Sequence, residues 1–179
     1  MERTLLAVTA LLLAAPPVRA QDTPARVTVS EMDPRPADVA TIDGVVAAYY
    51  EVVSGPVGQP RDWGRDRTLY LEPILFTIAR VDSAGTPFAH TIPWQQYVDG
   101  SDTYLVESGF TEREIHRETR QFGNIAHVWS TYEWTTADGQ TGRGINGLHL
   151  FHDGSRWWIT HATWDNERAA DPIPAEYLP

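Results

Sequence analysis

The stretch from Phe110 to Trp164 constrains the fold more than any other part of this chain. Three turn signals interrupt it: Phe-Gly-Asn at 122–124, Ala-Asp-Gly-Gln at 137–140 and His-Asp-Gly-Ser at 152–155. Asp-Gly and Gly-Asn between β-rich runs of alternating polarity are strong hairpin signals. The sequence therefore predicts an antiparallel meander of four strands.

The residues before this stretch have a different pattern. Apolar side chains recur every three or four residues from position 38 to 53, which predicts a helix. A second helix is expected at about 62–71, and a third from Trp94 to about Val98, directly after Pro93. Between the second and third helices, residues 74–81 and 88–92 form a predicted hairpin. Helices that are segregated from an antiparallel sheet define an α+β domain.

The first 20 residues predict export. Arg3 precedes an apolar run from Leu5 to Ala15, and small residues around Ala20 suit a cleavage site. The alternative is a membrane anchor or buried helix, but the run is too short to span a bilayer. We expect a signal peptide at 1–20, a polar tether at 21–37, one domain at 38–166 and a C-terminal tail at 167–179. The mature protein would be periplasmic or secreted.

Composition excludes several classes of function. The chain has no Cys, and all 14 of its basic residues are Arg, so thiol chemistry and lysine Schiff bases are absent. The formal net charge of −10 argues against nucleic acid or an anionic membrane as a partner. No phosphate-binding glycine loop or His-Glu-x-x-His motif is present, and we expect neither a cofactor nor a metal.

Folding each predicted hairpin about its turn estimates which side chains share a face, since paired residues point the same way. This register pairs His116 with Thr131, Trp129 with Leu148, and Asn146 with both Thr131 and His161. The face chosen to line a pocket holds Glu114, His116, Trp129, Thr131, Glu133, Asn146, Leu148, Leu150, Trp157, Ile159 and His161. A single β-bulge would exchange the two faces.

Several segments resemble the nuclear transport factor 2-like superfamily. They are Ala48-Tyr49-Tyr50, Arg61-Asp62-Trp63, residues 122–128, residues 130–133, residues 143–146 and residues 154–159. The superfamily includes SnoaL-like polyketide cyclases, ketosteroid isomerase and scytalone dehydratase, and exported bacterial members are similar to this chain. The resemblance implies a curved antiparallel sheet closed by three N-terminal helices into a cone with an internal pocket. Such a fold does not by itself fix function.

Four residues are the candidate acid–base catalysts: Glu114, His116, Glu133 and His161. Carboxylates and imidazoles that converge in an enclosed space have the perturbed pKa values that acid–base catalysis requires. The candidate ligand-binding residues are Tyr49, Tyr50, Trp94, Trp129, Thr131, Asn146, Leu148 and Trp157. The predicted function is binding of a small hydrophobic or polar-aromatic molecule, with a cofactor-free isomerase, dehydratase or cyclase as the enzymatic form. The alternative is a non-catalytic exported module that binds a ligand or a protein.

Two further alternatives concern the same residues. The glutamates can instead pair with Arg at the rim of the sheet, and Glu114, His116 and His161 can instead be metal ligands. The opposite face of the predicted sheet is rich in aromatic side chains, which favours a homodimer formed through that face. The aromatic residues assigned to it are Tyr132, Trp134, Phe151, Trp158 and Trp164.

Overall fold

The computed structural model describes residues 25–179. The predicted signal peptide at 1–20 and the first residues of the tether lie outside the described residues. Residues 25–35 form neither helix nor strand, and Val27 holds this segment to helix α4 (Trp94–Ser108). The Val27 backbone N–H donates to Asp99 Oδ1 at 2.8 Å, and its carbonyl accepts from Gln95 Nε2 at 3.0 Å. The N-terminal arm is therefore tied to the domain.

The order of elements agrees with the sequence prediction. The helices are α1 (Pro36–Val39), α2 (Ile42–Val53), α3 (Trp63–Arg67), α4 (Trp94–Ser108) and the short 3-10 helix η1 (Ala175–Tyr177). The strands are β1 (Leu75–Val81), β2 (Pro87–Pro93), β3 (Thr111–Phe122), β4 (Ile125–Thr135), β5 (Thr141–His152) and β6 (Trp157–Asn166). They form one sheet in the order β2-β1-β6-β5-β4-β3, and β1 pairs with β6 in parallel while all other neighbours are antiparallel.

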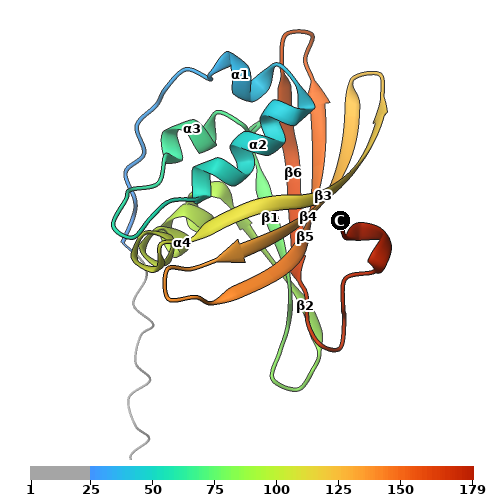
Figure 1. Cartoon of the computed structure of the whole chain (residues 1–179). Helices are drawn as coiled ribbons and strands as arrows, with labels where there is room; N and C mark the ends of the chain where they lie inside the picture. The colour runs from blue at the N-terminus through green and yellow to red at the C-terminus, as the bar shows by residue number, and fades with distance from the viewer. Residues whose placement is uncertain (1–24) are drawn as a thin grey trace, which may run out of the picture.

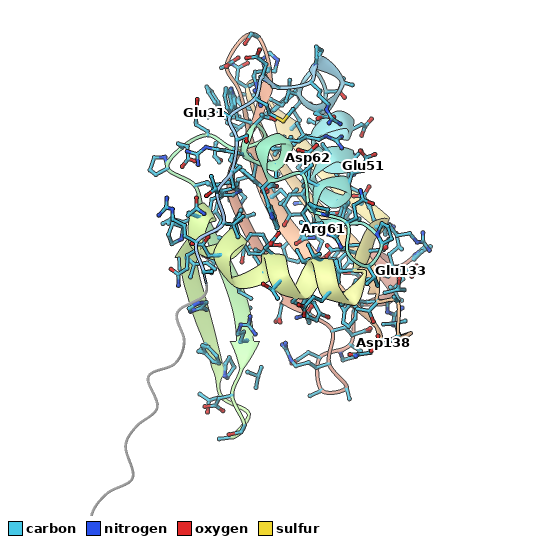
Figure 2. The ribbon with its side chains drawn as sticks, turned by 90° about the vertical axis from the view of Figure 1, so that its left-hand side faces the viewer. Glu31, Glu51, Arg61, Asp62, Glu133 and Asp138 are labelled. Atoms are coloured by element: carbon cyan, nitrogen blue, oxygen red, sulfur yellow. The ribbon has the colours of Figure 1, made fainter. Side chains whose placement is uncertain are left out.

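The sheet is curved, and its two faces are covered differently. Helices α1 to α4 all lie on one side of it, while the C-terminal segment returns on the other side (Figure 1). Seen from the helix side, α4 crosses in front of the strands (Figure 2). The predicted α+β cone is thus the observed architecture. No helix within residues 25–179 is both long and apolar enough to cross a membrane.

Helix boundaries follow local capping chemistry. The Thr41 side chain accepts a hydrogen bond from the Gly44 backbone N–H at 3.0 Å and starts α2. Helix α4 continues well past Val98 because Leu105 again buries an apolar side chain, and it ends at Gly109, whose φ of 63° suits glycine. Helix α3 is shorter than predicted and starts at Asp62, whose carboxylate accepts from the Arg65 backbone N–H.

A buried carboxylate joins α3, α4 and the core. Asp66 is 1% exposed and accepts hydrogen bonds from Trp94 Nε1 at 2.6 Å and from the Tyr70 hydroxyl at 2.8 Å. Burial raises the pKa of Asp66 to about 6, against the opposing effect of these two donors. The contacts fix α4 against α3 and so fix the helical wall that faces the sheet.

The pairing of β4 with β5 differs from the predicted register by one residue. Thr131 pairs with Ile145 and Ser130 pairs with Asn146, so Thr131 and Asn146 point to opposite faces. The cause is the loop between the strands. Thr136 N–H donates to Gln140 O and Gly139 has a φ of 87°, which leaves a three-residue loop with a left-handed glycine. The prediction assumed a two-residue turn, and one extra residue reverses which side chains face the helices.

Two β-bulges change the faces again. In β3 the partner shifts at Ile115: His116 pairs with Thr131 as predicted, but Glu114 pairs with Tyr132 rather than Glu133. In β6 the partner shifts at Thr160, so Leu150 pairs with Ile159 while His161 pairs with His149. Each bulge inserts one unpaired residue and turns the following side chains to the other face. The predicted pocket face is therefore a mixture of both faces of the real sheet.

Candidate functional site

A cavity of about 800 Å³ lies between the concave face of the sheet and helix α4. Its walls are rich in aromatic side chains, among them Tyr49, Phe76, Tyr97, Tyr132, Trp134 and Trp164. Phe76, Tyr97 and Trp164 contact one another edge to face, with ring centroids 5.1 to 5.9 Å apart. A concave, mostly aromatic space of this size suits a small organic molecule.

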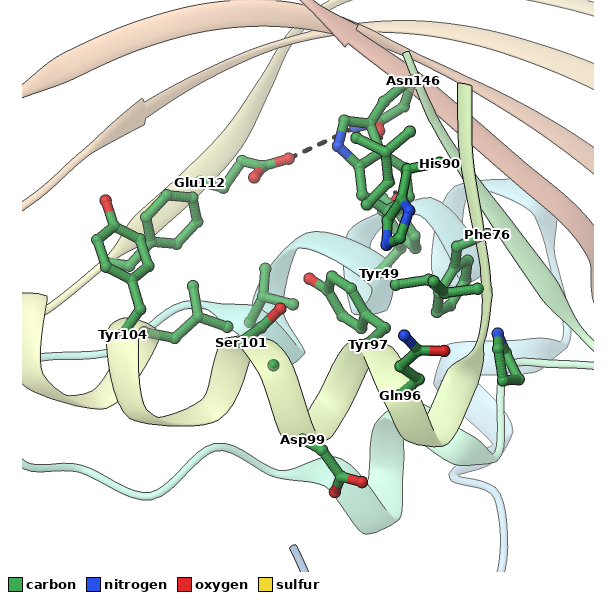
Figure 3. A pocket seen from close by; sticks show the side chains of 18 of the residues that line it. Tyr49, Phe76, His90, Gln96, Tyr97, Asp99, Ser101, Tyr104, Glu112 and Asn146 are labelled. Carbon is green, nitrogen blue, oxygen red and sulfur yellow. Dashed lines mark hydrogen bonds between the residues drawn. The ribbon is translucent and has the colours of Figure 1, made fainter. Parts of the chain in front are cut away.

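The carboxyl group of Glu112 projects into this cavity (Figure 3). Glu112 is half-buried as a residue, and it forms part of the cavity lining. Burial raises the pKa of Glu112 to about 7, and a hydrogen bond from Asn146 lowers it by a smaller amount. A carboxyl group with such a pKa can give up or accept a proton near neutral pH.

Asn146 connects Glu112 to the core. Its Nδ2 donates to Glu112 Oε1 at 3.4 Å and to the Tyr50 hydroxyl at 3.1 Å, while its Oδ1 accepts from the Tyr49 hydroxyl at 3.3 Å. The Tyr50 hydroxyl lies 2.7 Å from Ser130 Oγ, on the neighbouring strand. Both ends of the Asn146 amide are thus engaged, which fixes its N–H groups toward Glu112.

The tyrosines around Glu112 act as donors and not as bases. Burial raises the pKa of Tyr49, Tyr97 and Tyr132, and the nearby Glu112 carboxylate raises each further. Their hydroxyl groups therefore stay protonated at neutral pH. Glu112, and not one of these tyrosines, is consequently the group suited to exchange a proton with a bound molecule at this end of the cavity.

The four predicted acid–base residues do not converge. Glu114 is on the concave side but outside the cavity lining, where its carboxylate accepts hydrogen bonds from Arg117 at 2.6 Å and from the Ser130 hydroxyl group. Glu133 forms an ion pair with Arg113 at 2.5 Å on the outer face. The rim pairing weighed as an alternative is therefore the observed arrangement for Glu133.

Both predicted catalytic histidines are on the outer face. His161 follows the Thr160 bulge and lies 6.0 Å, ring to ring, from His149. Burial and the nearby His149 lower the pKa of His161. His116 pairs with Thr131, and its buried Nε2 has no hydrogen-bond partner within residues 25–179. Because Glu114 and His116 point to opposite faces, the alternative metal site that joins them with His161 is wrong.

Two of the eight predicted ligand-binding residues, Tyr49 and Asn146, line the cavity. Tyr50 lies behind them in the hydrogen-bond network. Trp94 is the structural partner of Asp66. Leu148 and Trp157 are buried away from the cavity. Trp129 borders a hollow of about 300 Å³ on the outer face. Thr131 is covered by the C-terminal segment, and its hydroxyl group donates a hydrogen bond to the Tyr177 carbonyl.

The aromatic face that predicted a homodimer is also divided. Tyr132, Trp134 and Trp164 line the internal cavity, while Phe151 and Trp158 pair with each other on the outer side of β5 and β6. The predicted continuous aromatic patch is therefore wrong. The homodimer itself stays a prediction, since the chain is described here as one copy.

Sequence reasoning missed Glu112, Tyr97, Arg80 and His90 as cavity residues. The helical spacing from Trp94 through Tyr97 to Ser101 and Tyr104 was a usable signal for α4. Glu112 stands two residues before Glu114 in the same strand, so the two side chains share a face unless a bulge lies between them. The assignment of Glu114 to the pocket face therefore applied to Glu112 as well. In the part of the chain that the structure describes, no three His, Asp or Glu side chains are grouped closely enough to hold a metal ion.

Comparisons with known proteins give structural neighbours and no sequence relatives. No family model matches the chain, and no curated protein matches it either. A protein of unknown function from Mycobacterium tuberculosis is similar in structure, with a TM-score of 0.55, 16% identity and coverage of 75% of each chain.

Similarity to a second solved structure is weaker. It is an NTF2-like protein of unknown function from Shewanella baltica, with a TM-score of 0.48, 14% identity and coverage of 72% of this chain and 92% of the other. Likeness at such identities concerns the fold alone. The curved six-stranded sheet, with its helices gathered on the concave side, is the architecture that the resemblance to the nuclear transport factor 2-like superfamily implied.

Proposed function

We propose that the cavity binds a small, mostly apolar molecule and that Glu112 exchanges a proton with it. The position of the Glu112 carboxyl group carries the proposal: it forms part of the cavity lining, and its pKa of about 7 lies near neutral pH. A carboxylate in an apolar space is a stronger base than one in water, and its protonated form is an available acid near neutral pH.

The surrounding groups suit proton transfer at a carbon atom next to a carbonyl group. A carbanion formed by loss of that proton places negative charge on the carbonyl oxygen, and hydroxyl donors in a dry site stabilise such a charge. The protonated hydroxyl group of Tyr97 lines the same cavity as Glu112, whereas the Tyr132 hydroxyl already donates to Asn166 Oδ1 at 2.7 Å. Of the predicted enzymatic forms, an isomerase is thus the simplest, since it needs only removal and return of one proton.

The alternative is a binding protein without a reaction. One observation favours it: the four residues predicted as acid–base catalysts do not meet, and Glu112 has no second titrating carboxyl or imidazole group bonded to it among the described residues. In this case Glu112 would serve as a hydrogen-bond partner for a polar group of the ligand.

Isotope exchange separates these two functions. Small molecules that co-purify with the protein are extracted, identified by mass spectrometry and returned to fresh protein in heavy water. The proposal expects the wild type to introduce deuterium and Glu112→Gln to introduce none while still binding the molecule. Glu107→Gln, which neutralises an exposed carboxylate of α4 outside the cavity lining, is the matched control. Binding without deuterium uptake by the wild type supports the non-catalytic function.

A further inference from the structure

One end of the cavity carries an acidic side chain and the other end carries basic side chains. Glu112 and Asn146 are at one end, on β3 and β5, while Arg80 and His90 line the other end on the β1–β2 hairpin. Arg80 and His90 are both exposed, so this end is the mouth, and no ion pair or hydrogen bond engages either side chain within residues 25–179. The guanidinium group of Arg80 is therefore available to a ligand at the mouth.

The sheet register gives the separation of the two ends. Asn146 pairs with Trp164, Trp164 pairs with Ile78, and Ile78 pairs with His90. All four side chains line the cavity, so they mark a path straight across β5, β6, β1 and β2. Three strand spacings amount to about 14 Å along the curved sheet. Between its ends this path is apolar, because Trp164 and Ile78 supply the wall.

The acidic groups near the cavity do not neutralise Arg80. Asp99 also lines the cavity, but its Oδ1 already accepts from the Val27 backbone N–H and from Gln95 Nε2, both at 2.8 Å. Glu112 lies at the far end, where its carboxyl group opposes the entry of a second negative charge. A negatively charged group on a ligand is therefore favoured at the mouth and disfavoured inside.

We propose that the cavity selects a flat apolar molecule that carries one anionic group, with that group held at the mouth by Arg80 and His90 and the ring system placed against Trp164 and Ile78. This inference rests on the proposed function, since it names the ligand class of the same cavity. Arg80 is a specificity-determining residue in this arrangement, and the guanidinium group supplies charge-assisted hydrogen bonds to a carboxylate, sulfonate or phosphate.

A pair of fluorescent probes with the same rings tests the inference. Anilinonaphthalene sulfonate carries one negative charge, and phenylnaphthylamine is its uncharged parent. Arg80→Gln should weaken binding of the sulfonate about fivefold, the effect of one partly exposed charge contact, and change binding of the parent less than about twofold. Arg80→Lys should restore most of the lost affinity. Arg120→Gln, which removes an exposed charge from β3 outside the cavity lining, should have no such effect.

Gly100 provides a control for the place of binding. It lines the mouth, and a Cβ added there meets no atom within 4 Å, so Gly100→Phe should obstruct entry without displacing backbone. Both probes should then bind more weakly than to the wild type. Equal loss of both probes in Arg80→Gln, or the same loss of the sulfonate in Arg120→Gln, would overturn the charge selection alone. Failure of Gly100→Phe to weaken either probe would overturn the cavity as a binding site and the inference with it.

Discussion

Replacing Glu112 with Gln tests the unusual carboxyl group without using a ligand. Gln has the shape of a protonated Glu, and its side-chain oxygen can still accept the hydrogen bond from Asn146 Nδ2. The pKa of Glu112 is raised from 4.5 to about 7 in the folded protein. Between these two values the folded state binds a proton that the unfolded state has released, so wild-type stability falls as the pH rises through this range.

The magnitude follows from the size of the shift. Each pKa unit corresponds to about 1.4 kcal/mol, so a rise of about 2.5 units destabilises the ionised wild type by up to about 3 kcal/mol. Glu112→Gln removes this loss. The variant should match the wild type at about pH 4.5 and exceed its free energy of unfolding by about 2 to 3 kcal/mol above pH 7. The value of about 3 kcal/mol is an upper limit, because water that enters the cavity screens the ionised carboxylate and reduces the destabilisation.

Urea unfolding followed by tryptophan fluorescence gives the free energy of unfolding of both proteins between about pH 4.5 and about pH 8. Asp66 also has a raised pKa, of about 6, but it is present in both proteins and cancels in their difference. Glu107→Gln should give a difference near zero at every pH. A difference for Glu112→Gln that does not change with pH, or a less stable variant above pH 7, would refute the assignment of Glu112 as an enclosed, protonatable group.

Three further predictions concern the frame of the site. Asp66→Asn should lower the free energy of unfolding by about 1 to 3 kcal/mol. The two carboxylate oxygens of Asp66 accept from Trp94 and Tyr70, and the single amide oxygen of Asn cannot replace both. An unchanged urea midpoint would contradict this prediction. Gly100→Ala should raise stability by about 1 kcal/mol, because Gly100 is exposed inside α4 with open space at its Cβ, and a thermal melt measures the change. The homodimer is checked by light scattering at micromolar concentration, where the mass of a single chain would count against it.

The order of elements could be predicted because it depends on local signals. Turn residues at 122–124, 137–140 and 152–155 lie where the structure has its turns, and Gly123, Gly139 and Gly154 all have positive φ. Apolar spacing in 38–53 predicted the buried side of the first helical region, which the structure divides into α1 and α2. These features involve residues close together in the chain, so each is set by conformational preferences that the sequence displays directly.

The identity of the cavity residues could not be predicted in the same way, because the face of a strand depends on every residue between it and the turn. The pairing of His116 with Thr131 was correct, yet both side chains lie on the outer face. An error of one residue in the loop before β5 was enough to place Thr131 beside Asn146. Packing of the helices, and not strand alternation, decides which face of the sheet is concave. The residues of those helices are far in the sequence from the strands that they cover.

The bulges at Ile115 and Thr160 have a consequence beyond register. If Ile115 paired regularly and did not bulge, strict alternation from His116 would turn Glu112 and Glu114 to the outer face, where water would keep the carboxylates ionised. If Thr160 paired regularly, strict alternation from Ile159 would turn His161 to the inner face. The bulge at Ile115 therefore places a carboxyl group in the cavity lining, and the bulge at Thr160 keeps the imidazole of His161 out of it. The proposed proton exchange at Glu112 depends on the first of these bulges, because regular pairing through Ile115 would leave that carboxyl group on the outer face.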